Sequence, residues 1–341
     1  MGRNPSDLLI FIGKRLLQLV PVIIGVILLT FVFTHLDLTN VCSEWYTHAG
    51  AGTIANCKRT VDQPWTTQLS EYFVNLAHGN FGATQFGTPV GPSVAAYLPA
   101  TLELVLAALF LMIVVGIPLG VVAAQYSGRW GDHLVRLFYL SGWATPTYLG
   151  AVIAAVFLAP FLGLPTRGDF STATVPFPQY THMSVVDALL AGNLPYTADA
   201  ISHLILPAAV LAFINMGIAT RMTRASMLEV LPLDYVRSAR MKGLSEFWVL
   251  YKHALRNALI TTTTVLGITA GGLLAGTVVV EEVFDWPGIG QYAYDAIGGG
   301  GSTPNFAGAI AVVIIFAIAV VAANLIADIL YGVLDPRVDW R

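Results

Sequence analysis

The densest group of charged side chains lies between residues 237 and 260, in the stretch RSARMKGLSEFWVLYKHALRNALI. Arg237, Arg240 and Lys242 fall close together, and Gly243 follows them directly. Cations at this spacing can bind an anionic surface, but they cannot by themselves make or break a covalent bond. Two surfaces fit this chemistry: a groove on a soluble partner protein and the anionic headgroups of a membrane.

The sequence around these cations predicts a helix, a turn and a second helix. Residues 234–242 would form a short helix that ends at Gly243, because glycine adopts the left-handed conformation without steric cost. Ser245 could then cap a second helix that runs towards Asn257. Small and apolar residues beside the cations favour a shaped socket on a partner over a loop held near lipid by charge alone. The expected apolar surface consists of Val236, Ala239 and Leu244.

The rest of the chain offers little that predicts catalysis. We expect no Asp, Glu, Lys or Arg at the middle of an apolar span, where carriers coupled to protons or sodium usually place them. No G-x-x-x-x-G-K-[ST] sequence is present to hold nucleotide phosphates. An intramembrane enzyme would need a catalytic pair at membrane depth, and His203 is better explained as a packed or interfacial histidine. We therefore expect no enzyme, cofactor or metal site, and any driving energy must come from another polypeptide.

The two cysteines are the remaining reactive side chains. Cys42 and Cys57 both lie in the long segment after the first apolar run. In an oxidising compartment they would form a disulfide that closes a short loop. The alternative is two unpaired thiols in a flexible loop.

The composition identifies the elements that must position these residues. Hydrophobic residues make up 56% of the 341 positions, charged residues make up 11%, and the mean hydropathy is +0.70. These values predict an integral, all-α membrane protein. Apolar runs of about 20 residues can cross a bilayer core as helices. Six such runs are expected, roughly at 14–34, 100–124, 134–159, 199–220, 258–280 and 307–331.

The distribution of cations predicts the orientation. With both termini in the cytoplasm, only Lys58, Arg59 and Arg167 of the 17 Lys and Arg residues fall in outside segments. The acidic residues Glu281, Glu282, Asp285 and Asp295 fall outside with no cation near them. The predicted protein is a multi-pass protein of the plasma membrane, with residues 237–260 in the cytoplasm.

One membrane domain accounts for the whole chain. Residues 1–35 hold the N-terminal segment and the first span, residues 36–99 form an extracytoplasmic loop, and residues 100–341 hold the other five spans. The loop contains TTQLSEYFVNLAHGNFG, which predicts a short amphipathic helix with Leu69, Phe73, Leu76 and Ala77 along one face. Pro146 and Pro207 would kink the third and fourth spans.

The fifth span is the candidate for a helix beside a substrate route. It contains Gly267, Gly271, Gly272 and Gly276, whose spacing permits close helix approach. Packing alone is the simpler explanation for any one of these glycines. The candidate residues of a translocation path are Asn215, Met216, Thr269, Gly272 and Gly276.

Several stretches resemble a known family in the same order along the chain. YVRSARMKGLS…HALRNAL resembles the EAA-type coupling loop of binding-protein-dependent ABC importer permeases, in the form found in the oligopeptide/dipeptide branch. The resemblance covers essentially the whole chain. The other matching stretches are KRLLQLVPVIIGVILLTFVF, LPATLELVLAALFLMIVVGIPLG, HLILPAAVLA, TRASMLEVL, VEEVFDWPGIG and ADILYGVLDPRVD.

The resemblance implies a type I ABC importer permease fold and a multi-subunit machine. Its implied partners are a second homologous permease subunit, two cytoplasmic ATPases, an extracytoplasmic binding protein and the bilayer, without nucleic acid. The implied function is import of dipeptides or oligopeptides by alternating access. Members of the branch also carry oligosaccharides and nickel, so the cargo stays open. The coupling loop would be 221–257, with Arg237, Ala239, Arg240, Lys242, Gly243 and Leu244 as its contact residues.

Two features depart from the family pattern. Thr261 stands where a proline commonly follows HALRNAL plus one residue, so the start of the fifth span would be less kinked. Residues 36–62, which include both cysteines, do not resemble the usual short linker. The contact with a binding protein is therefore the least defined part of the expected assembly.

Overall fold

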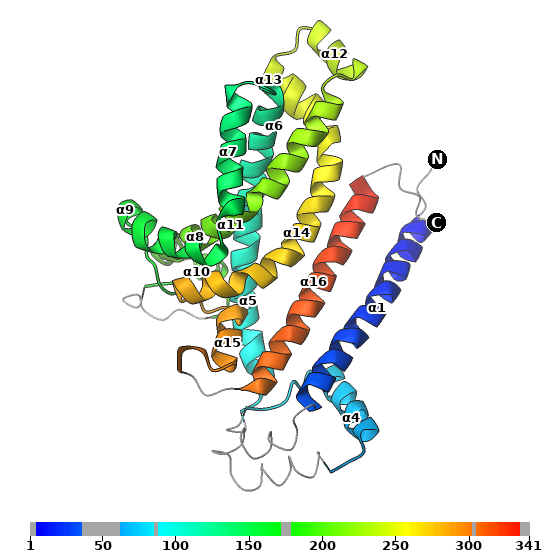
Figure 1. Ribbon diagram of the computed structural model, residues 1–341, viewed down its shortest axis with the longest axis vertical. Helices are drawn as coiled ribbons and strands as arrows, with labels where there is room; N and C mark the ends of the chain where they lie inside the picture. Colours follow the sequence, from blue (N-terminus) through cyan, green and yellow to red (C-terminus); the bar gives the residue numbers. More distant parts are fainter. Residues whose placement is uncertain (1–4, 36–61, 85–87, 172–178, 302–304, 335–341) are drawn as a thin grey trace.

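The computed structural model describes residues 5–35, 62–84, 88–171, 179–301 and 305–334 as a helical bundle (Figure 1). The only β pairing among these residues is an isolated bridge between Ala83 and Pro89. Its helices are α1 (Pro5–His35), α4 (Trp65–Ala77), α5 (Val90–Leu111), α6 (Ile117–Gln125), α7 (Trp130–Ala144), α8 (Thr147–Ile153), α9 (Ala159–Leu162), α10 (Ser184–Leu190), α11 (Leu194–Val230), α12 (Asp234–Met241), α13 (Glu246–Trp248), α14 (Leu255–Phe284), α15 (Ile289–Ala296) and α16 (Phe306–Leu334).

Short segments of other helix types continue or join these helices. Three of them are wider π-helical turns inside longer helices, in which the backbone hydrogen bonds join residues five apart. They are η1 (Met112–Gly116), η2 (Ala154–Leu158) and η3 (Val249–Ala254), and a short 3₁₀ turn, η4, covers Gly299–Gly301.

Five continuous helical segments are long and apolar enough to cross a membrane. They confirm five of the six expected spans, although most extend beyond the apolar run itself. The first and last are Gly13–Val32 and Ala307–Ala327. The three between them are Val90–Gln125, Leu194–Val230 and Glu246–Phe284.

The third expected span, 134–159, is a broken helix and not one straight crossing. The helical segments Trp130–Ala144 and Thr147–Leu162, which meet at Thr145 and Pro146, are bent by 105° relative to each other. Thr145 has an extended backbone (φ −84°, ψ 120°), as expected for a residue before proline, whose ring disfavours the helical conformation there. α8 and α9 therefore turn away from the bundle axis (Figure 1). Pro146 does interrupt the span, as predicted, whereas α11 continues through Pro207.

The two ends of the bundle carry different elements. α12 and α13 lie at one end, which we call the inner end after the predicted orientation, and α4 and α15 lie towards the other, the outer end (Figure 1). The first residues of α1 and the last residues of α16 are both nearer the inner side. α11 has 37 residues, so it is about 55 Å long, well beyond the ~30 Å core of a bilayer. Part of α11 must therefore stand outside the hydrocarbon core.

Glycines allow neighbouring helices to approach the central α11 and α14 closely. A Cβ added to Gly142 of α7 would lie 2.3 Å from the carbonyl oxygen of Phe213 in α11. A Cβ on Gly267 of α14 would lie 2.2 Å from Cβ of Ala327 in α16. Both positions need a residue without a side chain because the neighbouring atoms belong to backbone or to a short side chain.

We expect Gly142→Ala to destabilise the protein by about 1–2 kcal/mol, because the added methyl group would push α7 away from α11. Gly272→Ala is the matched control, since no atom lies within 4 Å of a Cβ at that position. Thermal unfolding followed by tryptophan fluorescence in detergent measures both. Equal midpoints for the two variants would contradict the close packing of α7 on α11.

The predicted helix in the outer loop is confirmed as α4. It packs against the end of α1, where the rings of Phe31 and Tyr72 lie 5.8 Å apart. Of the predicted apolar face, Leu69, Phe73 and Leu76 are half-buried, but Ala77 is exposed. The predicted disulfide lies outside the described residues and stays a prediction.

Candidate functional site

Residues 221–257, predicted to be the coupling loop and called so below, contain the expected helix, glycine turn and second helix. α12 ends at Met241, and Gly243 has a left-handed backbone (φ 76°), with its N–H donating to the carbonyl of Arg240 over 2.9 Å. A Cβ at Gly243 would meet no atom within 4 Å. The glycine is therefore required by backbone conformation and not by lack of space. The second helix starts at Glu246 and continues through η3 into α14.

An ion pair, and not a serine cap, closes the turn. Ser245 occupies the position before α13, but its side chain makes no capping hydrogen bond, so that prediction is wrong. Arg240 reaches across the turn instead, with Nη2 2.7 Å and Nε 3.2 Å from the two carboxylate oxygens of Glu246. The hydrogen bond to Glu246 raises the pKa of Arg240. Arg240 was expected to project towards a partner, and the structure uses it inside the loop.

The expected apolar docking surface is also wrong in part. Val236 and Ala239 are buried and pack with Val249 and Leu250 of η3 in the protein's own core. Ala239 therefore does not lie at the bottom of a socket open to a partner. Only Leu244 of the three predicted residues is exposed. The periodic apolar face of α12 is real, but it faces the same chain.

The exposed apolar surface of the loop comes from residues that sequence reasoning missed. Met241, Phe247 and Trp248 are 81%, 61% and 53% exposed at the inner end. Phe247 stacks on Tyr251 with ring centres 4.7 Å apart, and Nζ of Lys252 lies 5.5 Å from the ring centre of Trp248. The run EFWVLY was the available signal, because aromatic residues before an apolar span are unusual on a surface facing only water.

Two of the predicted cations remain available beside this apolar surface. Arg237 and Lys242 are exposed, and the nearest carboxylate oxygen to Arg237 is that of Asp234 at 4.0 Å. Asp234 is itself fully exposed, so this pair is weak. The hydroxyl of Tyr235 accepts a 2.7 Å hydrogen bond from Asn257, which fixes α12 to the start of α14. The loop thus presents exposed cations and aromatic rings, and its first helix is held against the start of α14 by this hydrogen bond.

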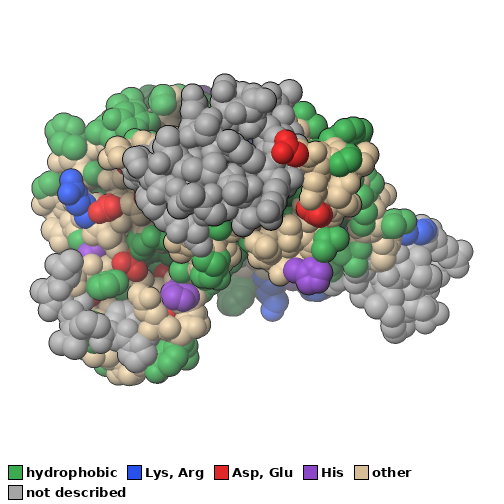
Figure 2. Space-filling view, turned by 90° about the horizontal axis from the view of Figure 1, so that it is seen from below, with side chains coloured by type: hydrophobic (Ala, Val, Ile, Leu, Met, Phe, Trp, Pro, Cys, Tyr) green, Lys and Arg blue, Asp and Glu red, His purple; other side chains and the backbone are tan. Residues whose placement is uncertain are grey.

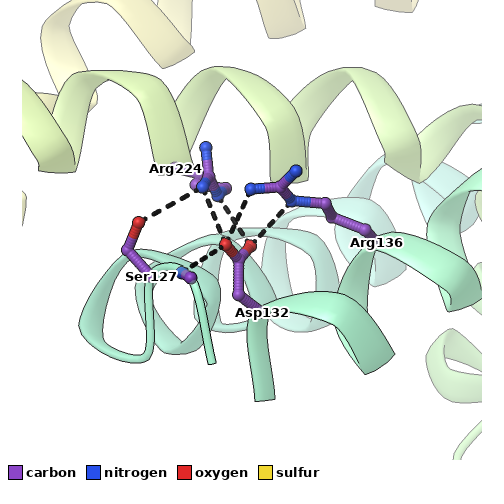
Figure 3. A network of polar contacts seen from close by, with 5 residues as sticks. Ser127, Asp132, Arg136 and Arg224 are labelled. Carbon is purple, nitrogen blue, oxygen red and sulfur yellow. Dashed lines mark hydrogen bonds and ion pairs between the residues drawn. The ribbon is translucent and has the colours of Figure 1, made fainter. Parts of the chain in front are cut away.

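A second polar feature, also missed, joins α7 to α11 (Figure 3). Asp132 is fully buried, and each of its carboxylate oxygens accepts from Arg136 and from Arg224, over 2.7–2.9 Å. The N–H of Gly128 adds a 3.0 Å bond, and Arg224 also reaches the hydroxyl of Ser127 at 3.4 Å. The spacing of Asp132 and Arg136 was a readable signal, whereas Arg224 is distant in sequence.

The candidate path residues differ in how closely they are packed. Met216 is buried in the core, and Thr269 is buried with its hydroxyl donating to the carbonyl of Val265. Asn215 is half-buried and donates to the carbonyl of Leu211. By contrast, a Cβ at Gly272 or Gly276 would meet open space. Of the five candidates, these two glycines lie on the most open surface.

At the outer end, two glutamates bind the first turns of short helices. Glu281 is buried and accepts from the N–H groups of Gly290 and Gln291 in α15, at 2.7 and 3.0 Å, and from the hydroxyl of Thr101 in α5 at 2.8 Å. The sequence placed Glu281 in an outside segment, and the structure encloses it between three helices. Nε1 of Trp286 donates to the carbonyl of Ala100 beside it.

Glu103 is the second of these glutamates. It lies inside the helix that begins at Val90, whereas the sequence placed it at the edge of a span starting at residue 100. It is buried and accepts from the N–H of Val185 in α10 over 2.9 Å. The expectation of no charged residue at the middle of a span therefore needs a correction here, because the helical segment Val90–Gln125 places Glu103 well inside it. Figure 2 shows the outer end, where acidic side chains and histidines lie among apolar ones.

Metal-binding geometry is absent from the part of the chain that the structure describes: no three His, Cys, Asp or Glu side chains there are placed to hold an ion. His203 is buried, and its Nδ1 lies 2.9 Å from the carbonyl of Asp199 in the preceding turn. This arrangement fits the packed histidine that the sequence predicted.

Comparison with known proteins identifies relatives over nearly the whole chain. Residues 116–340 match the family described as "Binding-protein-dependent transport system inner membrane component". The probable D,D-dipeptide transport system permease protein DdpB of Escherichia coli is 37% identical, over 95% of this chain and 96% of that protein. The di/tripeptide transport system permease protein DppB of Pseudomonas aeruginosa is 38% identical, with 97% and 99% coverage.

More distant similarities agree with these. The oligopeptide transport system permease protein AppB of Bacillus subtilis is 33% identical over 97% of this chain and 99% of that protein. Among solved structures, an inward-facing conformation of the MetNI methionine ABC transporter matches with a TM-score of 0.52 and 17% identity, over 69% of this chain and 93% of that chain. At this identity the structural match supports the fold alone.

Proposed function

Because this chain belongs to the family of binding-protein-dependent transport system inner membrane components, we propose that it forms half of the membrane path of an ATP-driven peptide importer. The chain itself makes and breaks no covalent bond. It acts as a transport subunit that opens alternately to the two sides of the membrane. The names of its relatives, with 33–38% identity over nearly full length, favour short peptides as the cargo.

The observation that carries this proposal is the continuity between the coupling loop and the outer end. One helical segment runs from Glu246 to Phe284, so the aromatic residues of the loop and the buried Glu281 belong to the same continuous helix. Glu281 in turn binds α15 and α5. A partner that moves the loop at the inner end would therefore move the junction of three helices at the outer end.

We assign the surface of the coupling loop to contact with a cytoplasmic ATPase. Met241, Phe247 and Trp248 provide apolar area, while Arg237 and Lys242 provide charge at its edge. An exposed apolar patch with a charged rim is typical of a protein interface. The complete machine would hold two ATPases, a second homologous permease subunit and an extracytoplasmic binding protein. The open surface around Gly272 and Gly276 is our candidate for the side that faces the second subunit and the path.

We expect Gly243→Val to uncouple ATP hydrolysis from transport. Valine is a poor occupant of a left-handed backbone, which costs an L-residue about 1–2 kcal/mol even without branching. The loop would relax to another conformation and displace α13 from α12. Gly243→Asn is the matched control, because asparagine tolerates this conformation. Import per ATP hydrolysed should fall for Val and stay near normal for Asn. Normal coupling in the Val variant would show that the turn does not need its left-handed residue.

The cargo can be tested by uptake in cells that depend on this transporter. We expect import of radiolabelled alanylalanine to require the chain and to be inhibited by excess unlabelled dipeptide. Members of the same branch also carry oligosaccharides and nickel, so maltotriose and Ni²⁺ are the competitors to compare. If alanylalanine uptake does not require the chain, whereas uptake of labelled maltotriose or Ni²⁺ does, the peptide assignment is replaced while the machine is unchanged.

A further inference from the structure

A cavity of ≈ 210 Å³ lies at the outer end, apart from the coupling loop and the open face of α14. α5 contributes Tyr97 to its wall, the segment after α9 contributes Asp169, and the turn after α14 contributes Pro287. The remaining polar wall comes from the start of α10 and the residues before it. These are Gln179, His182, Ser184 and Asp187.

The cavity wall is acidic: among the described residues it holds two carboxylates, Asp169 and Asp187, and one imidazole, that of His182. Asp187 is only 1% exposed. Its Oδ1 accepts from the N–H and the hydroxyl of Thr181, at 2.9 and 2.7 Å, but its Oδ2 has no hydrogen-bond partner in the part of the chain that is described. Asp169 accepts from the hydroxyl of Ser184. No Lys or Arg side chain is among the described residues that line the cavity.

A third carboxylate lies behind this wall. Glu103 binds the N–H of Val185 through Oε1, and its Oε2 is buried without a partner among the described residues. Burial raises the pKa of Asp169, which means that the site disfavours the charged form as it stands. Buried carboxylates are stable when a cation or several donors compensate them. A positively charged group that is rich in hydrogen-bond donors would compensate these carboxylates.

We propose that this cavity binds a protonated primary amine, with Asp187 and Asp169 as the carboxylates that receive its N–H groups. An ammonium group is compact and has three donors, which suits a small cavity whose wall holds two carboxylates. The ring of Tyr97, which is packed against Tyr292 at 5.3 Å between centres, adds an aromatic wall that attracts a cation. The described residues offer no competing metal-binding geometry at this place.

Two sources can supply this ammonium group, and the choice between them rests on the proposed function. The first is the free amino terminus of a peptide cargo on its way into the path. The second is a lysine side chain of the extracytoplasmic binding protein when it docks on the outer end. Both require the same chemistry in the cavity.

The test uses the full chain, assembled with its partner subunits in lipid nanodiscs, and needs no ATP hydrolysis. Alanylalanine amide, which carries an ammonium group and no carboxylate, is titrated by calorimetry, with N-acetyl-alanylalanine amide as the uncharged probe. We expect only the charged probe to bind, and Asp187→Asn to weaken it about tenfold, the effect of one charged hydrogen bond. The Asp187→Asn variant keeps a side-chain oxygen that can accept the hydrogen bonds from Thr181. Asp169→Asn is a second variant that tests the other carboxylate. Asp62→Asn, at an exposed carboxylate before α4, is the matched control.

The same nanodiscs are titrated with the binding protein, before and after acetylation of its lysines. If alanylalanine amide does not bind but Asp187→Asn weakens docking only of the unacetylated protein, the ammonium group comes from a lysine. If Asp187→Asn and Asp169→Asn change neither titration relative to Asp62→Asn, the proposal is overturned. That result would leave peptide import itself intact, because uptake by the unmodified transporter is measured separately.

Discussion

Replacing Phe247 and Trp248 together by Asp is expected to abolish peptide uptake and to reduce co-purification of the ATPase at least tenfold. The two rings are 61% and 53% exposed at the inner end, and they are the largest apolar side chains of the second half of the coupling loop. Aromatic anchors commonly contribute more than 2 kcal/mol each to an interface, and a carboxylate in their place would be desolvated without a partner. Quantitative pull-down of the ATPase with the tagged chain measures the loss.

Trp65→Asp is the control for this variant. Trp65 is 67% exposed, but it lies at the start of α4 at the outer end. It should leave ATPase co-purification unchanged. Size-exclusion profiles of both variants test whether folding is retained. Undiminished co-purification with the Phe247/Trp248 variant would remove the coupling loop as the ATPase contact.

The second large effect is expected from Asp132→Ala, at the junction of α7 and α11. The substitution would leave two guanidinium groups facing each other without their shared carboxylate. Breaking a buried ion pair from one side typically costs 3–5 kcal/mol, and we expect about 3 kcal/mol because Arg136 is 40% exposed. The midpoint of thermal unfolding in detergent should therefore fall well below that of the unchanged protein.

Asp234→Ala is the matched control at the same end of the molecule. Its carboxylate is fully exposed and lies 4.0 Å from Arg237, so its removal should shift the midpoint very little. Adding Arg224→Met to Asp132→Ala should recover part of the lost stability, because it removes one uncompensated charge. A midpoint for Asp132→Ala equal to that of Asp234→Ala would contradict the role of the network in Figure 3.

Local features of the fold were readable from the sequence. The apolar runs predicted the spans because their length matches the thickness of the bilayer core. Gly243 predicted a break because glycine permits a left-handed backbone, and Pro146 predicted one because proline disfavours the helical conformation of the residue before it. The 105° bend at Pro146 was not readable, since proline removes a helical hydrogen bond without fixing the direction of the next helix. That direction depends on how α8 packs against α11 and α14.

Features that depend on distant contacts were missed or assigned wrongly. The apolar face of α12 was visible, but the pattern cannot tell whether Ala239 faces a partner or the protein's own η3. Asp132 and Arg136 are four residues apart, a spacing that predicts an ion pair on one helix, whereas Arg224 joins them from a helix much later in the chain. Glu281 was read as an outside charge because its partners, Thr101 and the start of α15, meet only in the folded bundle.

The central claim, that this chain conducts peptides inward using ATP hydrolysed by its partners, is tested most directly by reconstituted transport. The complete transporter is placed in proteoliposomes, with the ATPases and ATP inside. The binding protein and radiolabelled alanylalanine are added outside, and the radiolabel that accumulates inside is measured over time. The account predicts accumulation with ATP, none with a non-hydrolysable analogue, and none when the chain carries the Phe247/Trp248→Asp pair. Accumulation that proceeds equally without ATP hydrolysis would contradict it.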